Sequence, residues 1–366
     1  MTCVLKAQGW SKQHHSPLIT KDSVIFKIAA PNAKQLFIQG SWMEGWTGQP
    51  MQKEADGYWY YRMARPSSEI YMYSLNIDGV SYIDPHNFRV FRDGQSVKSL
   101  FYIRGNKEPY IAYDDRVSKQ KGRLIKCWYP SSVYGYERRI SIYLPHGYDD
   151  IDKKYPVLYL QHGGGGDEDC WAVMGRVVQI MDYLIEKGKA EPMIVVMPNS
   201  MPIHEASADV MIPEEWIEDM RSDEFVNGTS YVESIYMDII PFVEKTFRVK
   251  KGKNNRSIAG LSMGAIYTLQ VTKQRPDLFD YIGIFSMGLT PDMDGEQMLS
   301  PLKKEGYELY WIGCGRQDAY SNAERLMKQL DTLGMPYTYF GELGGHNWSS
   351  WRKDLFEFAP LLFKKK

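Results

Sequence analysis

The chain has 366 residues, a length that favours two domains over one. A hydrophobic fraction of 43% and a charged fraction of 24% describe a globular protein able to bury a sizeable core. The formal net charge is -1, with no basic tract or acidic tail, so the charge pattern does not indicate nucleic acid or an anionic membrane as a partner. No apolar run of the sequence is as long as a membrane span.

The chain begins with a short apolar stretch, residues 1–7. This stretch is too short for a complete signal peptide but fits the remnant of one, and on this basis we expect a secreted or periplasmic protein. The cysteines have neither metal-ligand spacing nor the spacing of a disulfide framework, so they leave the redox compartment open. They are Cys3, Cys127, Cys170 and Cys314.

Short strands separated by turn residues dominate the first third of the chain. Apolar and polar residues alternate within them, and Asp56-Gly57 and Asp78-Gly79 are turn signals. Several short strands at regular spacing indicate an all-β sandwich, which we expect over residues 1–103. The expected strands are residues 24–28, 36–38, 58–61, 71–77 and 80–82.

Short motifs of this segment match a known module, at residues 26–33, 40–42, 56–59, 71–73 and 84–85. Through them the segment resembles the immunoglobulin-like, CBM48-like carbohydrate-binding module found at the front of glycogen-branching and isoamylase-type enzymes. The resemblance implies a glycan-binding face that bears Trp42 or Trp46. The alternative is that these tryptophans pack inside the sandwich or in the seam between domains, and we favour it because aromatic side chains are more often buried than used for binding.

Residues 104–122 are polar, contain two glycines and a proline, and predict a linker. Strand and helix patterns then alternate through residues 123–366, and apolar runs among them are typical of strands buried on both faces of a mostly parallel sheet. We therefore expect an α/β-hydrolase type of doubly wound sheet, with its site at the C-terminal ends of the strands. The expected strands are residues 123–129, 138–144, 156–160, 193–197, 308–313 and 337–340.

Helix signals lie between these strands. A helix is expected at residues 177–187, and capping-box patterns predict that two further helices start at Ser230 and Ser321. Gly334 is expected to end the helix that starts at Ser321.

The strongest chemical signal is residues 257–264, Ser-Ile-Ala-Gly-Leu-Ser-Met-Gly. A short apolar strand runs into Gly-x-Ser-x-Gly, and a helical pattern follows until Pro276. This is the layout of a nucleophile elbow, in which a strained strand-to-helix turn holds the serine Oγ clear of the backbone. Because the motif is common by chance, the other catalytic groups decide whether Ser262 is a nucleophile.

An acid and a histidine follow Ser262 in the order that α/β hydrolases use. Asp318 lies after one expected strand and His346 lies after the last one, so both are expected on loops. Asp292 and Asp294 are alternative acids, although their proline and glycine neighbours indicate turn residues.

A second chemical element is the glycine-rich stretch at residues 161–166, Gln-His-Gly-Gly-Gly-Gly. A phosphate-binding loop would end in Lys and Ser or Thr, whereas this one continues into Asp-Glu-Asp, which would repel phosphate. An oxyanion loop fits better, because successive glycines let backbone N–H groups face a tetrahedral oxyanion. We predict that the backbone N–H groups of Met263 and Gly164 are the donors, with Gly163 as the next choice.

The expected mechanism uses a serine, a histidine and an aspartate. His346 would take the proton of Ser262 as the hydroxyl attacks an ester carbonyl, and Asp318 would orient the imidazole and stabilise its cation. Water would then cleave the acyl-enzyme, so neither a metal nor an organic cofactor is required. His162 precedes the nucleophile in sequence, and we assign it a structural hydrogen-bonding role.

Several stretches of the second domain match one family, at residues 162–168 with Trp171, 192–199, 240–241, 247–249, 259–264, 346–348 and 351–352. Through them the chain is similar to the esterase D family, and especially to the feruloyl and acetyl-xylan esterases of carbohydrate esterase family 1. The resemblance spans nearly all of residues 123–366 and implies a serine carboxylesterase. An immunoglobulin-like module fused in front of such an esterase is a known arrangement in bacterial xylan-degrading enzymes. Two departures, Ala265 at a frequent glycine position and the all-glycine oxyanion loop, leave the acyl preference open.

Aromatic residues are the candidates for a substrate pocket. An aromatic wall would favour a hydroxycinnamoyl group over acetate, but most of these residues can equally close the core beside the loop that carries the histidine. The polar segment at residues 204–216 is expected to form one wall of the cleft. The candidate wall residues are Trp171, Trp216, Trp348 and Trp351, and the expected substrate contacts are Trp171, Trp348 and Gly163.

Our leading hypothesis is a feruloyl esterase that acts on feruloylated arabinoxylan or a similar ester-decorated plant polysaccharide. An acetyl-xylan esterase, an acyltransferase to a sugar acceptor and a siderophore-ester hydrolase would use the same three catalytic residues. A catalytically silent glycan-binding protein on a hydrolase scaffold is the competing class, because a fold alone does not establish catalysis. The intact set of Ser262, Asp318 and His346 argues for an enzyme.

Overall fold

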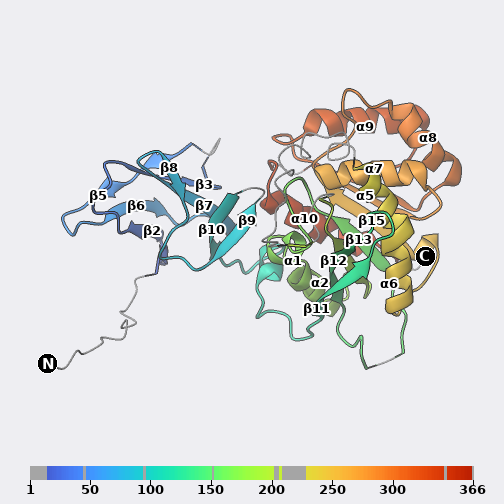
Figure 1. Ribbon diagram of the computed structural model, residues 1–366, viewed down its shortest axis with the longest axis horizontal. Helices are drawn as coiled ribbons and strands as arrows, with labels where there is room; N and C mark the ends of the chain where they lie inside the picture. Colours follow the sequence, from blue (N-terminus) through green and yellow to red (C-terminus); the bar gives the residue numbers. More distant parts are fainter. Residues whose placement is uncertain are drawn as a thin grey trace. The chain divides into compact units, whose positions relative to one another are not determined.

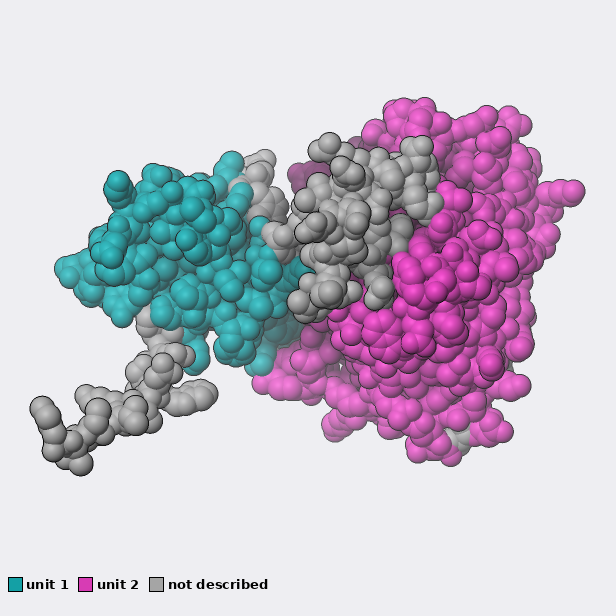
Figure 2. All heavy atoms as spheres, viewed as in Figure 1, with its two compact units in different colours: residues 1–106 teal, residues 107–366 magenta. Residues whose placement is uncertain are grey.

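The structure is a computed structural model of the chain. It describes residues 15–43, 47–93, 96–150, 152–201, 206–207, 228–341 and 344–364. The chain divides into two compact units, Met1–Asn106 and Lys107–Lys366 (Figure 2). Among the described residues, no helix is both long enough and apolar enough to cross a membrane.

The first unit consists of two antiparallel sheets (Figure 1). Its strands are β1 (Leu18–Ile19), β2 (Ser23–Ile28), β3 (Leu36–Gly40), β4 (Gln49–Pro50), β5 (Gln52–Lys53), β6 (Trp59–Ala64), β7 (Glu69–Ile77), β8 (Val80–Tyr82), β9 (Val90–Asp93) and β10 (Ser96–Ile103). One sheet has the order β1-β2-β6-β5, and the other has the order β4-β3-β7-β10-β9 with β8 paired to β7. Asp78 and Gly79 have φ values of 50° and 93°, as the predicted tight turn between β7 and β8 requires.

A shared aromatic core lies between the two sheets. Phe26 of β2 packs edge-on against Tyr73 of β7 and Phe101 of β10, with ring centroids 4.9 Å and 5.7 Å apart. Trp42 stacks on Phe26 at 5.4 Å and also contacts Phe101. This packing agrees with the favoured alternative, that Trp42 packs inside the sandwich, and not with the glycan-binding role that the resemblance implied. Trp46 lies outside the described residues.

Residues 107–122, part of the expected linker, belong to the second unit. They include a 3₁₀ helix, Tyr110–Tyr113, in which Tyr113 is fully buried. The Tyr113 carbonyl accepts hydrogen bonds from Nε and Nη2 of Arg176 at 3.1 Å and 2.9 Å. Specific contacts therefore hold this stretch to the second unit.

The second unit contains a mixed, eight-stranded sheet. Its strands are β11 (Arg123–Pro130), β12 (Glu137–Leu144), β13 (Val157–Gln161), β14 (Ile194–Pro198), β15 (Arg256–Leu261), β16 (Tyr281–Phe285), β17 (Leu309–Gly313) and β18 (Thr338–Phe340). The order is β11-β12-β14-β13-β15-β16-β17-β18, and all pairings from β14 to β18 are parallel. This agrees with the predicted mostly parallel sheet.

Helices cover both faces of this sheet (Figure 1). They are α1 (Cys170–Val173), α2 (Val177–Glu186), α5 (Thr229–Ser234), α6 (Ile240–Thr246), α7 (Met263–Gln274), α8 (Gly295–Glu305), α9 (Tyr320–Leu333) and α10 (Trp348–Phe358), with a π-helical turn, Ile235–Ile239, joining α5 to α6. Ile284 of β16 belongs to the core shared with α5 to α9, whereas its neighbour Phe285 contacts Phe358 of α10 at 5.5 Å. Alternate residues of one strand therefore face opposite helical layers.

Both helix starts that the capping-box patterns predicted lie one residue too late. The first helix begins at Thr229 rather than Ser230, and the second begins at Tyr320 rather than Ser321. Neither N-cap residue makes a side-chain cap. Gly228, which precedes the first helix at a φ of 56°, packs so closely on Tyr267 that tertiary contacts set the entry of the chain. Gly334 ends the second helix at a φ of 65°, as predicted.

Candidate active site

Ser262 occupies the turn between β15 and α7. Its φ of 52° and ψ of -118° lie outside the regions that residues with a side chain favour, a strain of about 1–3 kcal/mol. The strand and the helix approach so closely that a Cβ on Gly260 would overlap the Gly264 backbone. A Cβ on Gly264 would in turn overlap the carbonyl oxygen of His162. Packing therefore requires both glycines of the motif, and it holds the serine at the C-terminal end of its strand.

His346 lies between Ser262 and Asp318. Its Nε2 is 2.9 Å from Ser262 Oγ, and its Nδ1 is 2.7 Å from Asp318 Oδ1. An ionised carboxylate accepts hydrogen bonds only, so Nδ1 must carry the proton and Nε2 is left to accept one from the serine. The His346 side chain is 44% exposed, whereas the Asp318 side chain is fully buried. In this arrangement the solvent-exposed imidazole can accept the serine proton and so make the hydroxyl nucleophilic.

The Asp318 carboxylate is surrounded by donors. Oδ1 accepts from His346 and from the backbone N–H of Ala319 at 2.6 Å, and Oδ2 accepts from the hydroxyl of Ser286. Burial alone would raise the pKa of this carboxyl, but the hydrogen bonds from His346, Ser286 and Ala319 outweigh it and lower the pKa below its ordinary value. Asp318 therefore stays ionised at neutral pH.

Backbone contacts fix the loops that carry the acid and the histidine. Gln317 and Gly345 form an isolated parallel bridge, which places the residues just before Asp318 and His346 side by side. Directly after His346, the side chain of Asn347 caps helix α10 by accepting hydrogen bonds from the backbone N–H groups of Ser349 and Ser350. The histidine is therefore held between a bridge on one side and a capped helix on the other.

The glycine-rich loop begins where β13 ends, beside Ser262. Gly163 is buried, and a Cβ there would lie 2.6 Å from Leu261 Cδ1 and 3.2 Å from Ser262 Cβ. Gly164 is exposed, and a Cβ there would meet only Met263 Sδ, at 3.9 Å. Within the described part of the chain, the backbone N–H groups of Gly164 and Met263 donate no hydrogen bond. Among these residues neither N–H group has an acceptor, as the predicted role of oxyanion donor requires.

The buried side chain of His162 orients this loop through hydrogen bonds. Its Nδ1–H donates to the Gly163 carbonyl at 2.8 Å, and Gly166 N donates to the same oxygen at 3.2 Å. Because a trans peptide points its C=O and N–H in opposite directions, the Gly164 N–H is turned away from the His162 ring. Burial lowers the pKa of His162 to about 4, so the ring is neutral at pH 7 and Nε2 accepts from Ser200 N at 2.8 Å. This is the structural role that the sequence predicted.

The tryptophans expected as substrate contacts are mostly enclosed. Trp171 is 1% exposed and donates from Nε1 to the Gln161 carbonyl at 2.9 Å, while Trp348 is 5% exposed. The two rings meet edge to face at 5.4 Å, and Trp351 packs on Trp348 at 5.0 Å. These contacts favour the alternative that the sequence left open, a cluster that closes the core beside the histidine loop. Trp216 and most of the polar segment 204–216 lie outside the described residues.

Asp318, and neither of the alternative acids, is the carboxylate hydrogen-bonded to His346 among the described residues. Asp294 is the N-cap of α8, where its Oδ1 accepts from Gln297 N at 3.0 Å, and Asp292 is exposed. Both are turn or cap residues, as their neighbours in the sequence indicated.

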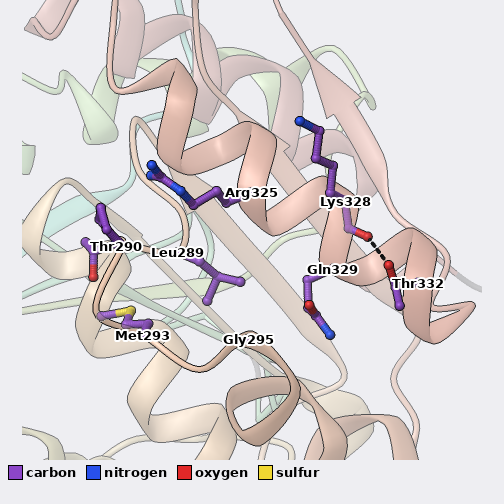
Figure 3. A pocket seen from close by; sticks show the side chains of 9 residues that line it. Leu289, Thr290, Met293, Gly295, Arg325, Lys328, Gln329 and Thr332 are labelled. Atoms are coloured by element: carbon purple, nitrogen blue, oxygen red, sulfur yellow. Dashed lines mark hydrogen bonds between the residues drawn. The ribbon is translucent and has the colours of Figure 1, made fainter.

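A pocket of about 240 Å³ lies between α9 and the segment that leads into α8 (Figure 3). Leu289 and Met293 form apolar parts of its lining, and Arg325 and Lys328 of α9 contribute cationic side chains. None of the candidate catalytic residues lines it. We therefore place the candidate active site at the strand ends and not in this pocket.

Sequence reasoning missed two serines that support the site. Ser286 donates to Asp318 Oδ2, and Ser200 donates its backbone N–H to His162. Each follows an apolar strand, Ser286 after β16 and Ser200 shortly after β14. A polar residue just past the C-terminal end of a buried parallel strand was the available signal, because these ends meet at the active-site edge of the sheet.

Comparison with known proteins identifies the class. The family model Esterase, described as "Putative esterase", matches residues 131–335. Together with the mixed sheet and the elbow at its edge, this match defines an esterase of the α/β-hydrolase type. The chain belongs to this esterase family.

Two curated relatives carry xylanase names. A Xylanibacter ruminicola protein named endo-1,4-beta-xylanase/feruloyl esterase is 30% identical over 346 residues, which is 93% of this chain and 44% of that protein. Endo-1,4-beta-xylanase Y of Acetivibrio thermocellus is 25% identical over 240 residues, which is 62% of this chain and 18% of that protein. The chain thus spans less than half the length of either relative.

Solved structures share the fold. A ferulic acid esterase from Anaeromyces mucronatus, solved with ferulic acid, has a TM-score of 0.60 and 24% identity, and the match covers 72% of this chain and 98% of that one. The enterobactin esterase of Shigella flexneri has a TM-score of 0.68 and 16% identity, and the match covers 98% of both chains. At these identities the likeness concerns the fold.

Gly264, two residues after Ser262, and Gly164, in the glycine-rich loop, should differ in their tolerance of a side chain. Gly264→Ala should destabilise the protein by about 2 kcal/mol or more, because its Cβ would overlap the His162 carbonyl. Gly164→Ala should change stability by less than about 0.5 kcal/mol, because its Cβ meets only Met263 Sδ at 3.9 Å. Thermal unfolding of both variants measures the difference, and equal shifts would contradict the close approach described for Gly264.

Asp318 should stabilise the fold in a pH-dependent way. Its pKa in the folded state lies below the ordinary value of 3.8, so its contribution is complete above that value and disappears as the pH falls through the lowered pKa. Asp318→Asn should therefore cost about 1–3 kcal/mol at pH 7, and progressively less below pH ~4. Denaturant unfolding of both proteins across this range tests the sign. Asp152→Asn, at an exposed carboxylate, is the control and should leave the unfolding midpoint unchanged. A loss for Asp318→Asn that grows towards low pH would refute the assignment.

Proposed function

We propose that this protein is a serine carboxylesterase that releases feruloyl or related hydroxycinnamoyl groups from plant cell-wall xylan through an acyl-enzyme. The observation that carries the proposal is the position of His346, within hydrogen-bonding distance of both Ser262 Oγ and Asp318 Oδ1. A structural serine has no need of an exposed imidazole that is itself held by a buried carboxylate. That arrangement is the requirement for an activated nucleophile.

In the acylation step, Ser262 Oγ attacks the ester carbonyl while His346 Nε2 takes the hydroxyl proton. Asp318 stabilises the imidazolium that forms. When the tetrahedral intermediate collapses, the bond to the leaving oxygen breaks and His346 gives its proton to that oxygen. A sugar hydroxyl leaves, and the acyl group stays on Ser262.

The negative charge of the intermediate requires donors placed before the reaction begins. The N–H groups of Met263 and Gly164 are the candidates, and each such donor is worth about 3–4 kcal/mol in comparable sites. In deacylation, His346 takes a proton from water, the water oxygen attacks the acyl carbon, and the proton returns to Ser262 Oγ as the acid leaves. The cycle needs no metal or organic cofactor.

The choice of substrate rests on the relatives. The Xylanibacter ruminicola protein combines xylanase and feruloyl esterase in its name, and the family model that matches this chain is an esterase. We therefore assign to this chain the feruloyl esterase activity in that name. Its substrate would be an ester-decorated polysaccharide such as feruloylated arabinoxylan. Such a polysaccharide lies outside the cell, which is consistent with a secreted or periplasmic protein.

The division of labour along the chain is part of the proposal. Residues 123–366 form the catalytic domain, and residues 1–103 form a CBM48-like module of the carbohydrate-binding type. Two antiparallel sheets around an aromatic core are compatible with such a module. Because Trp42 is part of that core, a glycan would have to bind through other residues.

Release of ferulate is the direct test. Wild-type protein should liberate ferulate from methyl ferulate and from feruloylated arabinoxylan, and Ser262→Ala should reduce the rate about 10⁴-fold or more. Ser257→Ala is a matched control at a buried serine of β15, the strand that leads to Ser262, and should retain full activity.

Assays with other substrates distinguish the alternative functions. Acetate release from acetylated xylan without ferulate release would support the mechanism but show that the acyl group is acetyl and not feruloyl. Hydrolysis of enterobactin alone would move the protein to siderophore esters. Binding of xylan without hydrolysis of any ester would refute the enzyme and leave a glycan-binding protein.

A further inference from the structure

Ser286 lies next to the candidate catalytic residues but has no part in the mechanism described above. It follows β16 in the sheet, the strand that pairs with the nucleophile strand β15, and its backbone N donates to the Gly313 carbonyl of β17 at 2.7 Å. Ser286 is fully buried, and its φ is 52°, a left-handed conformation that residues with a side chain rarely adopt. A strained residue persists only where its surroundings hold it in place.

The hydroxyl of Ser286 has its direction fixed by a neighbour. The indole Nε1–H of Trp351 donates to Ser286 Oγ at 2.8 Å, and indole nitrogen is a donor only. The serine oxygen is therefore the acceptor in that bond, and its own proton is free for another acceptor. That acceptor is Asp318 Oδ2, on the carboxylate whose other oxygen receives His346 Nδ1.

We propose that Ser286, itself oriented by Trp351, is a positioning residue that holds the Asp318 carboxylate in the orientation His346 requires; the inference rests on the proposed function. With Oδ2 fixed by Ser286, the carboxylate cannot rotate away from the imidazole, and Oδ1 stays directed at Nδ1. Trp351 thus donates to Ser286, and Ser286 donates to Asp318, whose other oxygen accepts from His346.

The same tryptophan also contacts the histidine. Trp351 meets the His346 ring edge to face, with centroids 5.2 Å apart and planes at 89°. Trp351 thus contacts His346 directly through its ring and is linked to Asp318 indirectly, through Ser286. Trp351 comes from helix α10, which begins two residues after His346, so the helix that follows the histidine also supports its acid.

Ser286→Ala removes the hydroxyl and leaves the substrate site unchanged. We expect kcat to fall about 10- to 100-fold, as for loss of one hydrogen bond to a charged group, with KM within about twofold of the wild-type value. Trp351→Phe keeps an aromatic ring and removes only the N–H, so kcat should fall less than in Ser286→Ala. Ser257→Ala, at another fully buried serine, is the matched control and should leave both constants unchanged.

A double-mutant cycle separates positioning from a general structural effect. If Ser286 acts through Asp318, then Ser286→Ala should cost little further activity in an Asp318→Asn background. A purely structural role predicts the opposite, a loss of the same size in both backgrounds. Thermal midpoints of all variants, measured beside the rates, ensure that the proteins compared are folded.

A proton NMR spectrum provides a readout that does not depend on turnover. The His346 Nδ1–H bonded to Asp318 should give a low-field resonance in the wild-type protein that shifts or broadens in Ser286→Ala. Wild-type kcat in Ser286→Ala, an additive loss in the double mutant, or an unchanged resonance would each overturn the proposal. If the wild-type protein hydrolyses no ester, the proposed function fails, and the resonance alone then decides whether Ser286 orients Asp318.

Discussion

The close approach of helix α7 to the end of strand β15 is the constraint on which the candidate site depends. Gly260 and Gly264 allow this contact because neither position has room for a Cβ. The turn between them forces Ser262 into a strained conformation, and the glycine-rich loop packs against the same point through Gly163. The proposed nucleophile and the proposed oxyanion donors are thus positioned by one packing arrangement, and a change there would disturb both together.

The polar groups of the site differ in how deeply they are buried. The side chain of Asp318 is fully buried and accepts hydrogen bonds at both oxygens, whereas the His346 side chain is 44% exposed. A buried, ionised carboxylate is stable only with such donors, and an imidazole must reach the substrate to move a proton. His162, unlike His346, is buried. Burial keeps its ring neutral, and the ring orients a loop. Two histidines near one serine therefore have different roles, which their surroundings determine.

The sequence was sufficient to predict the elements whose chemistry is local. The Gly-x-Ser-x-Gly turn, the continuous apolar strands and the order of Ser262, Asp318 and His346 each follow from neighbouring residues or from chain order. Ser286 had only a general signal, a polar residue just after an apolar strand, and no motif pairs it with Asp318, which is 32 positions away and meets it only in the folded sheet. The two helix starts depend likewise on tertiary packing. Strands β9 and β10 were not predicted individually, because polar residues at 92–96 interrupt their apolar pattern.

The central claim is that Ser262 is an activated nucleophile, and covalent labelling tests it most directly. A fluorophosphonate probe attacks only serines made nucleophilic by a neighbouring base, and peptide mass spectrometry locates the labelled residue. The account predicts one label, on the peptide that contains Ser262, and loss of that label in His346→Ala. A label on another serine, or an unlabelled protein that still hydrolyses esters, would contradict it.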